Sequence, residues 1–318
     1  FFKQKTAYEI GTGDWSSDVC SSDLKVGGTC LHWGCIPAKA MLETGDLLAK
    51  IGKAAEFGIR LAPAEGVDPT AIGARRDKIV ARMHAGLKSL FKKNGVELIA
   101  GSGTLVGGGA IDVALVDDGG AATGEHRRVS ATDIIVATGS SVRRIPGLET
   151  DGRLVVSSDE IVTGAFLPRR VIVVGGGAVG CEFASYFRDL GAETTIVEML
   201  PALVPLEDRD ASKELTRAFG KRGIAIHVAH RIVEGSLTKR ADGVALSIEP
   251  MEGGAALPLT ADLLVIAAGR VPNSGALGLE ATGVKVERGF IQVDAQMRTD
   301  RKSTRLNSSH PSRSRMPS

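Results

Sequence analysis

Two cysteines in a short glycine-rich stretch have the spacing in this sequence that most clearly suggests chemistry. Cys30 and Cys35 lie in Gly27-Gly28-Thr29-Cys30-Leu31-His32-Trp33-Gly34-Cys35-Ile36-Pro37-Ala38-Lys39, and a helix-like apolar run follows. Pro37 suits the first turn of a helix, so Cys35 is expected at the positive end of that helix, which favours a thiolate. Lys39 is expected on the same helical face as Cys35. Two close thiols beside a cation are what a redox-active disulfide needs.

A structural disulfide and half of a zinc site are the alternatives for this pair. The Cys-x4-Cys spacing is unusual for zinc, and no second Cys/His pair at ligand spacing follows it. The other cysteines are Cys20 and Cys181, which are too few for a disulfide scaffold in a chain of 318 residues. Spacing alone leaves the structural disulfide open.

Alternating helices and strands are expected to position these residues. A helix is predicted over 37–53, and an amphipathic helix over 71–93 ends at Asn94-Gly95. A further helix is expected over 209–222, and strands are expected at 96–99, 101–105, 110–116, 127–132, 133–140, 223–228, 243–249, 256–259 and 261–270.

A second motif predicts a dinucleotide site. The strand Arg170–Val174 leads into Gly175-x-Gly177-x-x-Gly180, a helix follows to Leu190, and the strand 194–198 ends at Glu198. Glycines in this context let the backbone approach a pyrophosphate at a helix N-terminus. Glu198 can accept hydrogen bonds from both ribose hydroxyls and would repel a 2′-phosphate, which favours NAD over NADP. A merely tight turn between strand and helix is the alternative.

Composition excludes several classes of function. The chain is 43% hydrophobic and 24% charged with a net charge of +2, so neither nucleic acid nor a membrane surface is indicated as a partner. The longest apolar run, around Val171–Ala184, is too short and too polar to span a bilayer. Few cysteines suggest a reducing compartment, and we expect a cytoplasmic protein.

The cysteine stretch resembles the signature of the flavoprotein disulfide reductases, Gly-Gly-Thr-Cys-x4-Cys-Ile-Pro-x-Lys. Residues 31–40 are most similar to the bacterial dihydrolipoyl dehydrogenases within that family, and the resemblance runs from about Lys25 to Asp300. It implies an α/β fold with two Rossmann-like FAD/NAD(P)-binding domains. The first of these domains would be incomplete, and the C-terminal dimerisation domain would be absent.

The resemblance also implies roles for individual residues. Cys30 would be the interchange thiol attacked by substrate, and Cys35 would form the charge-transfer thiolate against the flavin. Lys39 would pair with Glu182 in a buried ion pair beside the flavin N5, although a helix-start acid favoured by the dipole alone is the alternative for Glu182.

Two cofactors follow from the same resemblance, FAD and NAD. The residues expected to contact FAD are Lys39, Gly103, Thr138, Gly139 and Ser140. Those expected to contact NAD are Gly175, Gly176, Gly177, Ala178, Val179, Gly180, Cys181, Glu182, Glu198, Ile232 and Gly269. No metal site is expected: His227 and His230 could be ligands, but solvent-facing histidines at a strand end are the preferred interpretation.

The two ends of the chain depart from the family pattern. Residues 1–24 show no period of 2 or 3.6, and residues 301–318 are basic and serine-rich. We expect both to be foreign sequence joined to a gene fragment, with natural tails as the alternative. The expected organisation is a foreign tail at 1–24, a partial FAD-binding domain with the redox disulfide at 25–150, an NAD-binding domain at 151–270, a return segment of the FAD domain at 271–300 and a foreign tail at 301–318.

Three parts of the family pattern are not found in the sequence. They are the first FAD phosphate loop, the aspartate that binds the flavin ribityl chain, and the His/Glu base. Gly11-Thr12-Gly13 is not that loop because no apolar strand precedes it, and His310-Pro311 has Arg315 where the acidic partner would stand.

The function implied for the intact parent is oxidation of protein-bound dihydrolipoamide through the disulfide and FAD, with hydride passed to NAD+. Its partners would be the lipoyl domains of 2-oxoacid dehydrogenase complexes, and the parent would be a homodimer. Mercuric reductase, glutathione reductase and transhydrogenase activities are the alternatives within the family. A separate hypothesis is that the chain as written is an inactive remnant, with a folded NAD lobe and little or no bound FAD.

Overall fold

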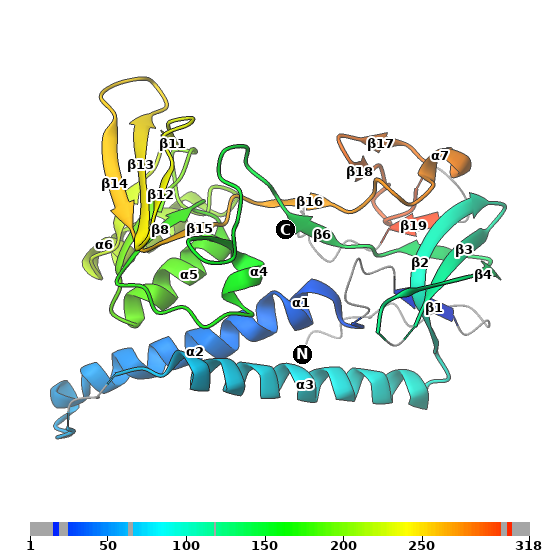
Figure 1. The fold of residues 1–318 in the computed structure, drawn as a ribbon, viewed down its shortest axis with the longest axis horizontal. Coiled ribbons are helices and arrows are strands. Elements are labelled where there is room, and N and C mark those ends of the chain that lie inside the picture. Colours follow the sequence, from blue (N-terminus) through cyan, green and yellow to red (C-terminus); the bar gives the residue numbers. More distant parts are fainter. Residues whose placement is uncertain (1–14, 19–24, 63–65, 118, 300–303, 307–318) are drawn as a thin grey trace. The chain divides into compact units, whose positions relative to one another are not determined.

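The computed structural model describes residues 15–18, 25–62, 66–117, 119–299 and 304–306, and of 15–18 and 304–306 the backbone alone (Figure 1). The chain divides into two compact units. Unit 1 comprises residues 1–29, 82–141 and 271–318, and unit 2 comprises residues 30–81 and 142–270. The predicted foreign tails, with Cys20 and His310, lie almost wholly outside the described residues.

A five-stranded parallel sheet forms the centre of unit 2. Its strand order is β10-β9-β8-β15-β7, and every neighbouring pair is parallel. The strands are short runs of β-branched and apolar residues, which is typical of a sheet covered on both faces. They are β7 (Val155–Ser157), β8 (Arg170–Val174), β9 (Glu193–Val197), β10 (Ala225–His227) and β15 (Leu263–Ile266).

Alternate residues of these strands enter two different cores, because successive strand side chains point to opposite faces. Val171 and Val265 pack with the helices α5 (Ala178–Asp189) and α2 (Cys35–Gly52). Ile172 and Leu264 pack with a second, antiparallel sheet. The strands of that sheet are β11 (His230–Ile232), β12 (Thr238–Arg240), β13 (Gly243–Pro250) and β14 (Leu257–Ala261), of which β13 and β14 form the long yellow hairpin in Figure 1.

Further helices complete unit 2. They are most of α1 (Gly28–His32), the 3-10 helix η1 (Ala54–Phe57), the first half of α3 (Pro69–Lys93), α4 (Ser158–Ile161) and α6 (Arg209–Lys221). The start of α6 is fixed by Asp208, whose carboxylate accepts the Asp210 N–H at 2.7 Å.

Unit 1 contains a four-stranded sheet of order β1-β2-β3-β4, in which β1 is parallel to β2 and the other pairs are antiparallel. The strand β5 pairs in parallel with β19 near the C-terminus of the chain. The elements are β1 (Trp15–Asp18), β2 (Glu97–Gly107), β3 (Ala110–Val116), β4 (Ala122–Ser130), β5 (Ile134–Val136), β6 (Ser140–Val142), β16 (Arg270–Pro272), α7 (Leu279–Thr282), β17 (Val286–Glu287), β18 (Phe290–Ile291) and β19 (Thr304–Leu306).

Most predicted elements are present, with changed bounds. The strands expected at 96–99 and 101–105 form one strand, β2, and the strand expected over 133–140 is reduced to β5. Gly101 does not interrupt β2, since it pairs with Leu115 of β3 in the regular part of the ladder. The position requires glycine because a Cβ there would lie 2.4 Å from the Ala114 carbonyl oxygen. The α/β class is confirmed. An incomplete Rossmann-like FAD domain remains a prediction, as do the domain boundaries at 150 and 270.

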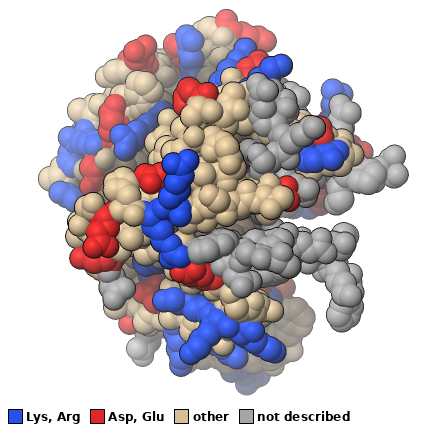
Figure 2. All heavy atoms as spheres, turned by 90° about the vertical axis from the view of Figure 1, so that its right-hand side faces the viewer, with Lys and Arg blue, Asp and Glu red and all other residues tan. Residues whose placement is uncertain are grey.

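The charged residues described in Figure 2 are interspersed, with lysines and arginines lying next to aspartates and glutamates. This arrangement agrees with the small net charge of the sequence. Within the described ranges, no helix combines the length and the apolar character needed to cross a bilayer.

Candidate active site

The two cysteines lie side by side at the junction of two helices in unit 2. Cys30 is on α1, and α2 begins at Cys35 itself, directly after Gly34. Both are free thiols, and they are in hydrogen-bond contact. The prediction that Cys35 stands at a helix N-terminus is therefore confirmed, although the helix begins two residues earlier than expected. The redox disulfide between them remains a prediction that this adjacency permits.

The environment of Cys30 favours the neutral thiol. Partial burial, followed by the contact with Cys35, raises the pKa of the Cys30 thiol to about 11, while the charge of Lys39 acts in the opposite direction. Cys30 is consequently protonated at neutral pH, and it needs a base before it can attack a disulfide as the thiolate.

The expected ion pair between Lys39 and Glu182 is present. The Lys39 Nζ lies 2.5 Å from the Glu182 Oε1, which connects α2 to the first turn of α5. The pair was expected to be buried, and this part of the prediction is wrong: the side chains of Lys39 and Glu182 are 57% and 31% exposed. The apolar face of α2, with Ala38 and Met41, occupies the buried side of the helix and leaves the lysine at its edge. An exposed pair adds about 0–1 kcal/mol to stability, so its main effect is orientation.

The glycine loop between β8 and α5 has the shape of a phosphate-binding turn. Gly175 has a φ of +111°, and a side chain there would meet the Ala267 carbonyl oxygen at 2.4 Å. A Cβ on Gly180 would stand 1.9 Å from the Gly175 carbonyl oxygen, so α5 packs directly against the loop. At Gly177, the N-cap residue, a Cβ would meet no atom within 4 Å, which leaves an open cradle at the helix N-terminus. The predicted dinucleotide contact at this loop remains a prediction that the open position at Gly177 permits.

Glu198 lies beside the loop, where its carboxylate has a task that the sequence motif did not reveal. The Glu198 Oε2 accepts the Gly176 N–H at 2.5 Å, and its Oε1 accepts the Leu200 N–H at 2.7 Å. Each carboxylate oxygen offers about two acceptor sites, so one on each remains for a ribose hydroxyl. The predicted ribose contact is thus chemically possible and remains a prediction.

Three other residues predicted to contact NAD have different surroundings. Cys181 is buried and donates to the Gly176 carbonyl oxygen at 3.3 Å; burial, with lesser contributions from Glu198 and Glu182, raises the pKa of its thiol to about 12. The Cys181 thiol is therefore an unreactive part of the core. Ile232 is half-buried against the core formed with the antiparallel sheet, and Gly269 has a φ of +98°.

His227 and His230 are half-buried, so their side chains face solvent only in part. The rings of His227 and His230 lie 5.5 Å apart, edge to face, and the His230 Nδ1 is 2.7 Å from the Val228 carbonyl oxygen. Burial, and then the neighbouring His230, lowers the pKa of His227. Across the described part of the chain, no group of three or more His, Cys, Asp or Glu side chains is placed to hold a metal ion.

In unit 1, two of the five residues expected to contact FAD, Gly103 and Thr138, border a small cavity between β2 and β5. Gly103, Ile134, Val136, Thr138 and Leu277 are among the residues that line it. The side chains that line it are mostly aliphatic, with Thr138 as the polar exception. Among the described residues, the only Gly-x-Gly-x-x-Gly loop is the one at 175–180, so the fit of unit 1 to a complete FAD is partial.

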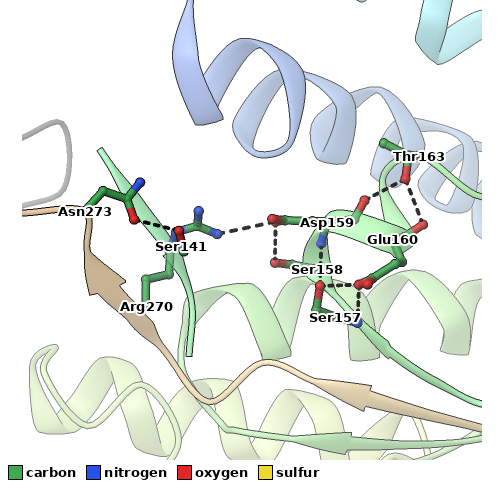
Figure 3. A network of polar contacts seen from close by, with 8 residues as sticks. All are labelled: Ser141, Ser157, Ser158, Asp159, Glu160, Thr163, Arg270 and Asn273. Atoms are coloured by element: carbon green, nitrogen blue, oxygen red, sulfur yellow. Dashed lines mark hydrogen bonds and ion pairs between the residues drawn. The ribbon is translucent and has the colours of Figure 1, made fainter. Parts of the chain in front are cut away.

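The turn after β5 is held by Asn273, a residue that the sequence analysis did not single out for a role. Thr138 donates its hydroxyl to the Asn273 carbonyl oxygen at 2.8 Å, and the Asn273 Nδ2 donates to the Thr138 carbonyl oxygen at 3.1 Å. Ser141 donates to the Asn273 Oδ1 at 2.6 Å, as Figure 3 shows. These bonds fix a turn in which Gly139 adopts a φ of +70°. No local spacing could have indicated this pairing.

A second network in Figure 3 fixes the start of α4 in unit 2. Ser157 and Glu160 form a capping box, and the Arg270 Nη1 lies 3.4 Å from the Asp159 Oδ1. The Ser-x-x-Glu spacing is a signal that the sequence does carry. The ion pair places Arg270 beside the start of α4.

Comparison with known proteins agrees with this geometry. The family described as pyridine nucleotide-disulphide oxidoreductase matches residues 9–303, and proteins of that family use FAD and NAD(P). The dihydrolipoyl dehydrogenase of Chlorobaculum tepidum is 36% identical over 274 residues, which are 86% of this chain and 56% of the relative. That of Bacillus subtilis is 32% identical, over 92% of this chain and 65% of the relative.

Among solved structures, LpdA from Mycobacterium tuberculosis superposes with a TM-score of 0.79 at 26% identity, covering 92% of this chain and 60% of LpdA. The disulfide reductase RclA from Escherichia coli shares the fold, with a TM-score of 0.69 at 22% identity, covering 89% of this chain and 57% of RclA. The chain thus spans a little over half the length of these proteins.

Proposed function

Because this chain belongs to the pyridine nucleotide-disulphide oxidoreductase family, we propose that it carries the dithiol and nicotinamide-nucleotide centres of a dihydrolipoyl dehydrogenase. One observation carries the proposal: the helix that begins at Cys35 is joined, through Lys39 and Glu182, to the helix of the nucleotide-binding loop. The curated relatives with that name support the choice of substrate.

In the proposed reaction, a dihydrolipoyl thiolate attacks the Cys30 sulfur of the Cys30–Cys35 disulfide and releases Cys35. The second lipoyl sulfur then attacks the first and frees Cys30. The products are a lipoyl disulfide and the Cys30/Cys35 dithiol, so two electrons and two protons have moved onto the protein. FAD, when bound to the completed enzyme, would supply the electron acceptor between this dithiol and NAD+.

The chain's own residues give this centre its proton requirements. The high pKa of Cys30 means that this sulfur, once released as a thiolate, takes up a proton at neutral pH and must lose it before it attacks, so a proton donor and acceptor must serve it. The family base that the sequence analysis does not find would have this role. We propose that it comes from outside the described residues.

The partners that fit this reaction are lipoyl domains of 2-oxoacid dehydrogenase complexes, and the proposed parent is a cytoplasmic homodimer. Mercuric reductase, glutathione reductase and transhydrogenase activities are the competing proposals. To distinguish these activities, the turnover rates of the completed enzyme are compared for four substrates: dihydrolipoamide, glutathione disulfide, Hg2+ and the pair NADPH/NAD+. Preference for a substrate other than dihydrolipoamide would reject the specific assignment.

The chain by itself is proposed to be a fragment that retains little FAD and has no turnover. Unit 1 offers a small cavity but, in its described residues, no Gly-x-Gly-x-x-Gly loop, whereas unit 2 has such a loop, with an open position at Gly177. We expect the purified chain to be nearly colourless between 350 and 500 nm and still to bind NAD+ in a calorimetric titration. Stoichiometric flavin absorbance would refute the remnant hypothesis, and lack of NAD+ binding would refute the nucleotide site.

A charge reversal at Glu198 tests the choice of nucleotide. In Glu198→Arg, the ribose acceptor is lost and a cation that suits a 2′-phosphate is gained. We expect the ratio of the Kd values for NAD+ and NADP+ to shift toward NADP+ by about a hundredfold, or about 2–3 kcal/mol. Calorimetric titration of both nucleotides measures it.

The matched control is Glu252→Arg, which makes the same charge change at an exposed turn between β13 and β14. It is expected to leave the ratio within twofold. An unchanged ratio in Glu198→Arg would place the ribose elsewhere.

A further inference from the structure

Gly45 is a buried glycine in the middle of α2, on the face that meets α5. The buried residues of this face, Ala38, Met41 and Gly45, are three and four positions apart, as one side of a helix requires. Ala38 and Met41 belong to the same core as Phe183 and Tyr186 of α5. Glycine is an unfavourable residue in a helix interior, so its presence there calls for a reason in the packing.

The reason is a close approach of two helices. A Cβ on Gly45 would lie 3.1 Å from the Asp189 Cβ and 3.7 Å from the Tyr186 Cδ2. Tyr186 is 2% exposed, and Asp189 is held by Arg222, whose Nη2 is 2.7 Å from its Oδ1. Neither neighbour has room to withdraw. Even a methyl group at position 45 would therefore crowd Asp189, and a larger side chain would push α2 away from α5.

The same two helices carry the ion pair at their other contact. Lys39 precedes Gly45 by six residues on α2, and Glu182 precedes Asp189 by seven residues on α5. At about 1.5 Å per residue, the two contacts are separated by about 9 Å along one helix and about 10 Å along the other. The spacing of the helices at Gly45 therefore sets the distance that the Lys39 and Glu182 side chains must bridge.

We propose that Gly45 is a positioning residue for the thiol centre: the missing side chain lets α2 approach α5 closely enough to keep Lys39 paired with Glu182 beside Cys30. The inference rests on the proposed function only in taking Cys30 as a reacting thiol. Lys39 lowers the pKa of Cys30, and Glu182 neutralises part of the field of that lysine. The helix spacing thereby tunes the reactivity of the thiol.

The test is a double-mutant cycle read at one thiol. Each reduced 318-residue variant is treated with iodoacetamide at pH 8, and the alkylation rate of Cys30 is obtained by peptide mass spectrometry. In Glu182→Gln, the charge of Lys39 is no longer balanced, so the pKa of Cys30 falls. We expect alkylation about threefold faster or more, as a decrease of about half a pKa unit gives.

The cycle then asks whether Gly45 controls that effect. In Gly45→Leu, the pair is already separated, so Cys30 should react as fast as in Glu182→Gln, and the added Glu182→Gln change should have no further effect. The control is Gly86→Leu, the same change in the interior of α3 at a position with no atom within 4 Å of the Cβ. In that background the full acceleration by Glu182→Gln is expected.

Two outcomes would overturn the inference. One is full acceleration by Glu182→Gln in the Gly45→Leu background, which would reduce Gly45 to a packing role. The other is no acceleration by Glu182→Gln in the unmodified chain. If Gly45→Leu does not fold, Gly45→Ala serves in its place, with part of the acceleration expected and its complete absence counting against the inference. The assay needs neither nucleotide nor flavin, so its result is independent of a failure of the proposed oxidoreductase activity.

Discussion

The Cys35→Ser variant of this chain will lose the ability to form an internal disulfide. Glutathione disulfide should oxidise the unmodified chain to a Cys30–Cys35 disulfide with release of two glutathione molecules, because the two thiols are already in contact. In the variant, the Cys35 thiol that contacts Cys30 is absent and cannot displace the glutathione. We therefore expect complete loss of the internal disulfide and accumulation of a mixed disulfide at Cys30. Mass spectrometry of the intact and digested chain distinguishes the two products.

Cys181→Ser is the matched control for that experiment. Cys181 is 4% exposed and donates to the Gly176 carbonyl oxygen, a bond that a serine hydroxyl can also make. The Cys181→Ser variant should therefore form the Cys30–Cys35 disulfide to the same extent as the unmodified chain. In the completed enzyme, the same Cys35→Ser change should also abolish the long-wavelength thiolate–flavin absorbance band. A surviving internal disulfide at Cys30 or a surviving band would reject the assignment of Cys35.

The second large effect is expected at Gly180. In Gly180→Ala, the new Cβ would stand 1.9 Å from the Gly175 carbonyl oxygen, and it would also crowd the Val173 side chain at 3.4 Å. Because the obstacle is backbone, α5 must move away from the loop. We expect the variant to lose about 3 kcal/mol of unfolding free energy and to bind NAD+ at least tenfold more weakly. Urea denaturation and calorimetric titration measure the two effects.

Gly177→Ala separates folding from binding at the same loop. A Cβ there meets no atom of the protein within 4 Å, so stability should change by less than about 0.5 kcal/mol. Binding of NAD+ should nevertheless weaken, since the methyl group would fill the cradle at the helix N-terminus. If Gly177→Ala bound NAD+ normally, the dinucleotide would not use this cradle, and if Gly180→Ala were as stable as the unmodified chain, the packing argument would be wrong.

The sequence by itself determined the features that depend on neighbouring residues. A helix that starts next to Cys35, the glycine loop at 175–180 and the long helix α3 follow from turn-forming residues and apolar periodicity, which act over a few positions. The order of strand, loop and helix was sufficient to predict the nucleotide fold. The pairing of Lys39 with Glu182 came from the family resemblance, because no local pattern connects residues 143 positions apart.

Only the tertiary structure decided how those parts constrain one another. It showed that the ion pair is exposed, since the buried side of α2 is taken by Ala38, Met41 and Gly45. It showed that the Glu198 carboxylate accepts hydrogen bonds from two backbone amides, and that Asn273 is bonded to the turn at Thr138. These contacts arise when distant segments pack at fixed distances and satisfy their buried polar groups, and a linear sequence does not specify those distances.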